Sequence, residues 1–116
     1  MSLRMYGIGS CDACRKARQW MKRQDLAFEW VDLRENPPPS QKISRWLSEA
    51  GADRLVNRRS TTWRNLPEDE RPALEFDGWA DFLLDHPTLI KRPVIDDGTS
   101  VCAGFSDDTR KWLAGT

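Results

Sequence analysis

Hydrophobic and polar positions follow a different spacing in each part of the chain, and each spacing predicts an element. The short apolar run Leu3–Ile8 ends at Gly9 and Ser10, which predicts a strand followed by a turn. From Asp12 to about Gln24, apolar residues recur at helical spacing with basic residues largely opposite them. Apolar positions between Phe28 and Leu33 predict a second strand, which must end before the three prolines at 37–39.

The central part of the chain predicts mainly helical structure. Ser40 is a suitable cap for a helix whose apolar residues recur until Gly51, where the helix should stop. The polar and basic stretch 53–71 predicts short helical turns and loops. Another helix is expected over 77–85, ending at His86 and Pro87.

The last part of the chain predicts a hairpin followed by a helix. Asp97-Gly98 separates the apolar positions of 89–95 from those of 100–102, and this dipeptide is a strong hairpin signal. A final amphipathic helix should begin at Ser106 or Asp107. The order strand, helix, strand, helices, hairpin, helix predicts a single α/β domain over residues 1–116.

Composition excludes several classes of protein and partner. With 116 residues, 39% of them hydrophobic and 31% charged, the chain is typical of one soluble folded domain. Its formal net charge of zero gives no reason to expect nucleic acid or a membrane as a direct partner. Three cysteines do not form a secreted disulfide framework, and no run has the length of a signal peptide or membrane span. We therefore expect a cytoplasmic location.

Candidate chemistry gathers at the start of the first predicted helix, where Cys11 and Cys14 form a C-x-x-C pair. A helix N-terminus stabilises a thiolate through its unpaired N–H groups and the positive end of the dipole. Arg15 and Lys16 add positive charge nearby, while Asp12 opposes them. The sequence therefore predicts a reactive Cys11 with Cys14 one turn behind it.

A C-x-x-C pair between a strand and a helix is the arrangement of a thioredoxin-like redox site. Cys11 at the exposed helix start could attack, and Cys14 on the inward face could resolve the mixed disulfide. Two structural thiols are the alternative, and for Cys14 both interpretations stay open. Zinc would need four ligands, and only Cys102 and His86 remain without paired spacing, so we predict no metal. Cys102 is expected to face the core.

Pro93 and several arginines are further candidates. A proline is poorly tolerated inside a strand, so Pro93 should stand at the start of one, with either a cis or a trans peptide bond. Arg58, Arg59 and Arg92 could bind an anion, because the guanidinium group makes bidentate contacts with oxyanions. Composition alone would leave all three as solvated surface residues.

An ordered series of motifs resembles the ArsC/Spx/YffB family over nearly the whole chain. The motifs are Tyr6-Gly7-Ile8, Cys11–Arg18, Glu35–Pro38, Asn57–Arg64, His86–Val94 and Gly104–Ser106. The resemblance implies a thioredoxin-like fold, in which helices flank a mixed central sheet and a helical insertion separates its two halves. It also implies a cis proline at Pro93.

The resemblance further implies a thiol oxidoreductase similar to the glutaredoxin-coupled arsenate reductases. In those enzymes a cysteine at the Cys11 position attacks arsenate, arginines hold the oxyanion, and glutathione with glutaredoxin regenerates the thiol, so no tightly bound cofactor is expected. Arg92 matches one of these arginines. Where a second should follow Leu55-Val56 the chain has Asn57 before Arg58 and Arg59, and Ala103 stands where the third is expected.

The stretch from Asn57 resembles the YffB branch, and the C-x-x-C pair resembles the Spx branch. We therefore expect Cys11, Cys14 and Arg92 to be catalytic, and Arg15, Arg58, Arg59, Arg92 and Pro93 to bind an anionic substrate or glutathione. The expected partners are glutathione or glutaredoxin and a small oxyanion or disulfide substrate. The alternative that the resemblance implies is a redox-switched transcription regulator that binds the RNA polymerase α subunit.

Overall fold

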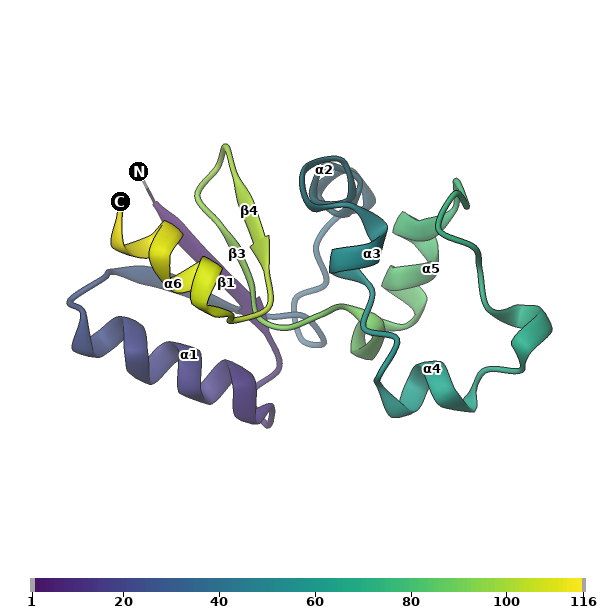
Figure 1. Ribbon diagram of the computed structural model, residues 1–116, viewed down its shortest axis with the longest axis horizontal. Helices are drawn as coiled ribbons and strands as arrows, with labels where there is room; N and C mark the ends of the chain where they lie inside the picture. The colour runs from purple at the N-terminus through teal and green to yellow at the C-terminus, as the bar shows by residue number, and fades with distance from the viewer. Residues whose placement is uncertain (1, 116) are drawn as a thin grey trace. The chain divides into compact units, whose positions relative to one another are not determined.

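Strands from both ends of the chain form one mixed sheet. In the computed structural model, which describes residues 2–115, these strands are β1 (Leu3–Gly7), β2 (Phe28–Asp32), β3 (Val94–Asp96) and β4 (Val101–Ala103). Their order in the sheet is β2-β1-β3-β4. Figure 1 labels three of these strands, β1, β3 and β4. The β1 and β2 strands are parallel, whereas β3 is antiparallel to β1 and to β4. The predicted mixed α/β architecture is confirmed.

The chain divides into two compact units. The first unit comprises Met1–Asn36 and Arg92–Thr116, and so contains the sheet; the second is the continuous segment Pro37–Lys91. The described part of the second unit contains helices and no strand longer than a single bridge, between Val56 and Ile90. The helical insertion expected from the resemblance is this second unit. That the chain is a single domain stays a prediction.

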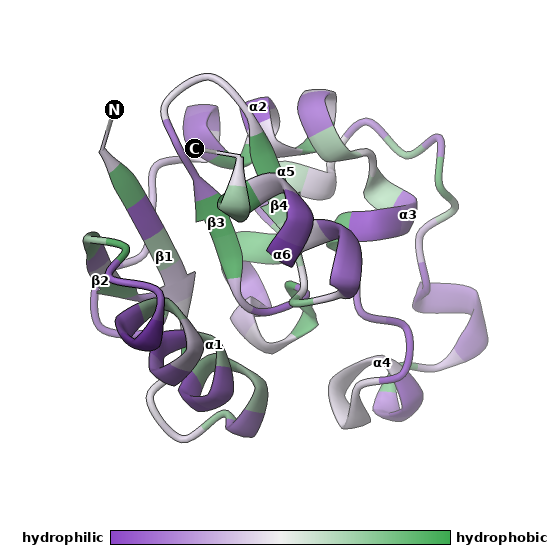
Figure 2. Cartoon of the chain, turned by 60° about the vertical axis from the view of Figure 1, so that its left-hand side comes forward, coloured by the Kyte–Doolittle hydropathy of each residue, from purple (hydrophilic) through white to green (hydrophobic). Residues whose placement is uncertain are grey.

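Two helices cover one face of the sheet in the first unit. Helix α1 (Asp12–Arg23) and helix α6 (Asp107–Ala114) bury apolar side chains against β1 and β3. The shared core consists of Leu3, Met5, Ala17, Met21, Ile95 and Leu113. Burial of each large side chain contributes about 1.5–3 kcal/mol. The outward face of α1 is strongly hydrophilic (Figure 2), which confirms the amphipathic helix predicted there.

The predicted hairpin and final helix are also confirmed. Asp97 Oδ1 accepts hydrogen bonds from the N–H groups of Thr99 and Ser100, and Gly98 adopts a positive φ of 95°. These contacts close the turn between β3 and β4. Ser106 caps α6 and forms a capping box with Thr109.

The second unit contains the helices α2 (Ser40–Ala50), α3 (Ala52–Leu55), α4 (Thr61–Asn65) and α5 (Trp79–Asp85), with short 3-10 turns at Glu68–Glu70 and Pro87–Leu89. Its buried side chains include Ile43, Trp46, Leu55, Val56, Leu83, Leu89 and Ile90. The short helical turns expected over 53–71 are therefore present.

Two sequence predictions in this region were wrong in detail. Ser40 does not cap α2, because Pro39 occupies the N-cap position and Ser40 is the first helical residue. Leu89, expected in an apolar strand run, lies in a 3-10 turn. The prediction that Pro93 stands at the start of a strand is confirmed, since β3 begins at Val94 directly after it; proline has no N–H to donate to a ladder.

No helix in the described range 2–115 is long and apolar enough to span a membrane.

Candidate active site

Cys11 is held at the mouth of α1 by the loop that leaves β1. It occupies the N-cap position with extended backbone angles of −80° and 124°, and its N–H donates to the Ile8 carbonyl at 3.0 Å. The Gly9 N–H donates to Asp32 Oδ2 at 3.2 Å and so ties the loop to the end of β2. The sequence prediction that Cys11 lies at a helix N-terminus is confirmed.

The two thiols of the pair differ sharply in exposure. Cys11 is partly exposed, whereas Cys14 has no exposed surface, and both are free thiols. A methyl group on Gly7 would overlap the Cys14 sulfur and come within 2.8 Å of Trp30 Cη2. The Cys14 thiol therefore packs directly against the bare backbone of β1, in space that exists because residue 7 is glycine.

The surroundings push the two thiol pKa values apart. Burial raises the pKa of Cys11. This effect is outweighed by hydrogen bonds from the N–H and thiol of Cys14, by the charge of Arg92 and by the N–H of Ala13, so the pKa lies below its ordinary value. Burial, and then the neighbouring Cys11, raises the pKa of Cys14 to about 12. Because the thiolate is the reactive form of cysteine, these opposite shifts favour Cys11 over Cys14 as the thiolate of the pair.

Strand pairing brings Arg92 to the cysteine pair. Val94 pairs with Tyr6 in antiparallel register. The N-terminal end of β3 therefore lies beside the C-terminal end of β1. Arg92 and Pro93 immediately precede β3, and the peptide bond between them is cis, as the resemblance implied. Pro93 is buried and its carbonyl accepts from the Gly104 N–H at 2.8 Å. The positive charge of Arg92 therefore acts on both thiols.

The other predicted anion-binding arginines are all exposed. Arg15 lies in the first unit and forms an ion pair with Asp12 at 2.6 Å. Arg58 and Arg59 lie in the second unit, in the turn between α3 and α4, where the Arg59 N–H donates to Asn57 Oδ1 at 3.1 Å. Anion binding by these three residues stays a prediction.

Sequence reasoning missed two residues that support the pair. Gly7 belongs to the motif Tyr6-Gly7-Ile8, but nothing local indicates that Cys14 needs the space above it. Asp32 accepts from the N–H groups of Arg34, Glu35 and Gly9. These donors, with that of Glu35 first, hold the pKa of Asp32 below its usual value. The position of Asp32 at the end of a predicted strand was the only feature of the sequence that could have indicated this role.

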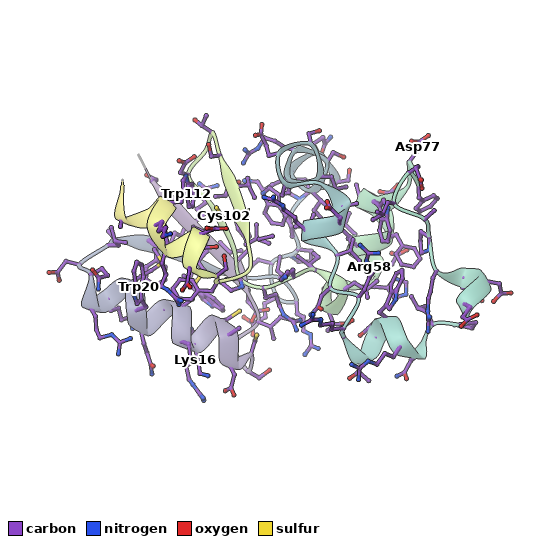
Figure 3. All side chains as sticks on the ribbon, viewed as in Figure 1. Lys16, Trp20, Arg58, Asp77, Cys102 and Trp112 are labelled. Carbon is purple, nitrogen blue, oxygen red and sulfur yellow. The ribbon has the colours of Figure 1, made fainter. Side chains whose placement is uncertain are left out.

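The remaining candidates for metal binding do not gather. Among residues 2–115, no three His, Cys, Asp or Glu side chains come together as a metal site. Cys102 lies on β4 opposite Ile95, on the same face as the core (Figure 3). The expectation of a core-facing thiol was only partly right: β4 is an edge strand, and Cys102 is half-buried.

Three comparisons place these features among known proteins. The model of the ArsC family matches residues 6–112. An uncharacterized protein of Haemophilus influenzae is 35% identical over 103 residues, which cover 89% of this chain and 90% of that protein. The global transcriptional regulator Spx of Lactiplantibacillus plantarum is 28% identical over 106 residues, covering 90% of this chain and 80% of the regulator. A solved structure of a YffB protein matches with a TM-score of 0.84 at 30% identity, over 96% of this chain and 97% of that one.

Proposed function

Because this chain belongs to the ArsC family, we propose that it is a thiol-dependent oxidoreductase whose nucleophile is Cys11. The observation that carries the proposal is the asymmetry of the pair. Cys11 is accessible with a lowered pKa, while Cys14 is buried with a raised one. An accessible thiolate beside a protected second thiol suits exchange through a mixed disulfide that the second thiol then resolves.

With a disulfide substrate, the Cys11 thiolate attacks one sulfur and forms a mixed disulfide. The other sulfur leaves as a thiolate and takes up a proton. Cys14 then loses its proton to solvent and attacks the Cys11 sulfur, which forms the Cys11–Cys14 disulfide and releases the second substrate thiol. Two electrons pass from the pair to the substrate. Two glutathione thiols, or a dithiol glutaredoxin, return the pair to the reduced state and become a disulfide themselves.

Arsenate is a second substrate that fits the same nucleophile. The Cys11 thiolate would displace water from the protonated oxyanion to form a thiol ester of As(V), with Arg92 holding the anionic oxygens. Attack by glutathione or Cys14 on the Cys11 sulfur would form a disulfide and transfer two electrons, which releases As(III). The same charge of Arg92 would suit a glutathione carboxylate. The exposed Arg58 and Arg59 are proposed as further anion-binding residues on the strength of their motif.

The decisive assay follows turnover of the purified protein with glutathione and glutaredoxin, on arsenate and on a small disulfide in parallel. Cys11→Ser should reduce the rate at least about a thousandfold, because the hydroxyl of serine is a far weaker nucleophile at neutral pH. Cys14→Ser should stop formation of the intramolecular disulfide while leaving the mixed disulfide on Cys11 trappable. Cys102→Ser is the matched control and should retain turnover. Full activity of Cys11→Ser on both substrates would refute the assignment.

The likeness to a transcription regulator supports a second candidate. The Spx relative aligns over 80% of its length, and a C-x-x-C pair can act as a redox switch. Under this alternative the reduced and oxidised forms would bind the RNA polymerase α subunit with different affinities. A pull-down with purified α C-terminal domain tests it, with Cys14→Ser as a variant that cannot switch. Recovery of no polymerase subunit in either redox state would exclude this function.

A further inference from the structure

A groove lies along α1 and is lined in part by Ala13, whose N–H also helps to lower the pKa of Cys11. It has a volume of about 510 Å³ and belongs entirely to the first unit. Its walls are α1 on one side and the start of α6 with the preceding loop on the other, and Asp12, Ala13, Lys16, Gln19, Trp20, Arg23, Phe105 and Arg110 line it. Asp12 and Ala13 directly follow Cys11 in the chain, so one end of the groove is formed by the residues next to Cys11.

The length of the groove fits an extended chain. Its α1 residues run from Asp12 to Arg23, the two ends of a 12-residue helix. A helix of that length rises about 18 Å. An extended peptide advances about 3.3–3.6 Å per residue, so roughly five residues would span the groove. A tetrahedral oxyanion would occupy only a fraction of it.

The floor of the groove is aromatic. Trp20 projects between α1 and α6, and its ring meets that of Phe105 edge-on with centroids 5.5 Å apart (Figure 3). Both side chains stay partly exposed. The Arg110 guanidinium lies 5.2 Å from the Phe105 ring. The same guanidinium forms an ion pair with Asp107. The aromatic surface would therefore accept an apolar side chain of a ligand.

The rim of the groove is basic although the protein is neutral overall. Helix α1 carries five basic residues and one acidic residue, in a chain whose formal net charge is zero. The acidic residue, Asp12, is already paired with Arg15. Over residues 2–115, Lys16 and Arg23 make no ion pair. Charge complementarity therefore selects an anionic ligand along this helix.

We propose that this groove docks an extended acidic segment of the protein partner whose disulfide exchanges with Cys11. The inference rests on the proposed function and narrows its substrate class to proteins that carry such a segment. Acidic side chains would pair with Lys16 and Arg23, and an apolar side chain would cover Trp20 and Phe105. Docking along α1 leads the segment toward Cys11 and raises its local concentration there.

The binding test uses fluorescence anisotropy with a labelled pentapeptide of four glutamates around a central leucine. The full-length reduced protein should bind it, and affinity should fall steeply as salt is raised. A version with four glutamines should bind at least tenfold more weakly. The double variant K16E/R23E should lose at least tenfold in affinity. The control K22E/K111E changes the net charge equally at positions that do not line the groove, and it should bind as the unmodified protein does.

Equal weakening by both double variants would overturn the proposal, because attraction would then be a property of net charge alone. Stronger binding of a DNA oligonucleotide or of phosphatidylserine vesicles than of the peptide, with the same loss in K16E/R23E, would assign the groove to those ligands and also overturn it.

A kinetic test separates this proposal from the proposed function. The peptide is made with a mixed disulfide at one end, and its rate of exchange with Cys11 is divided by that of an uncharged small disulfide. This ratio should exceed ten in the unmodified protein and approach one in K16E/R23E. A ratio near one in the unmodified protein, with Cys11 still reactive, would refute only the docking proposal. Loss of exchange with both disulfides would refute the proposed function.

Discussion

At the residue scale, burial and one missing methyl group decide how two identical thiols behave. Cys14 has no exposed surface and packs on the backbone of Gly7, while Cys11 at the helix mouth meets solvent. In return, the N–H and thiol of Cys14 lower the pKa of Cys11. The position of Cys14 is thus one of the causes that lower the pKa of Cys11.

The substitution Gly7→Ala should therefore damage both stability and reactivity. Overpacking against Cys14 and Trp30 should cost about 1–3 kcal/mol in the free energy of unfolding, measured by urea titration under reducing conditions. Displacement of Cys14 should also raise the pKa of Cys11, seen as a higher midpoint in the pH profile of alkylation by iodoacetamide.

Gly9→Ala is the matched control on the same loop. A methyl group there meets only Asp32 Oδ2, at 3.9 Å. Its unfolding free energy should change by no more than about 0.5 kcal/mol. If the two alanine variants behaved alike, the packing role of Gly7 would be wrong.

At the element scale, short-range contacts fix where helices and turns begin. The hairpin turn is closed by Asp97, and α6 is started by the capping box of Ser106 and Thr109. Thr109 is buried and its hydroxyl also donates to the Gly104 carbonyl at 3.0 Å. Since Phe105 and Arg110 flank this cap, the start of α6 also positions one wall of the groove.

We expect Ser106→Ala to destabilise the protein by about 1 kcal/mol, because the Thr109 N–H loses its capping acceptor. Thermal or urea unfolding measures this loss. Ser48→Ala, at an exposed position inside α2, should change stability by no more than about 0.5 kcal/mol. A loss no larger for Ser106→Ala than for Ser48→Ala would show that the cap contributes nothing.

At the scale of the whole molecule, the pKa of Cys11 depends on a charge close to it and not on the net charge of the protein. The chain is neutral overall, so no global field favours a thiolate at Cys11. The charge that lowers the pKa of Cys11 comes from Arg92. The pairing of β1 with β3 brings Arg92 to the same end of the sheet as the C-terminal end of β1.

Arg92→Met should consequently raise the pKa of Cys11, by roughly one unit. Removal of a nearby cation disfavours the thiolate, so a higher pH is needed to form it and the alkylation midpoint moves upward. Arg34→Met removes the same charge from an exposed position of the first unit and should leave the midpoint in place. Equal shifts in the two variants would mean that net charge, not the position of Arg92, sets the reactivity.

Much of this protein is determined by its sequence alone. Apolar spacing predicted β1, α1 and β2 nearly to their ends, Asp97-Gly98 predicted the hairpin, and the C-x-x-C pair predicted an outer and an inner thiol. These features depend on interactions within a few residues, such as helical periodicity, turn conformation and capping, and such interactions can be read along the chain. The misplaced cap at Ser40 is a local error of one residue.

Only the tertiary structure decided what surrounds the thiols. The placement of Arg92 depends on Val94 pairing with Tyr6, and the need for glycine at position 7 depends on where Cys14 packs. The aromatic floor of the groove likewise joins Trp20 to Phe105, far apart in the chain. No local pattern encodes these contacts, because strand register and packing between elements are set by the whole buried core. The sequence by itself therefore singled out Cys11 as the candidate nucleophile, and the fold decided which groups lower its pKa.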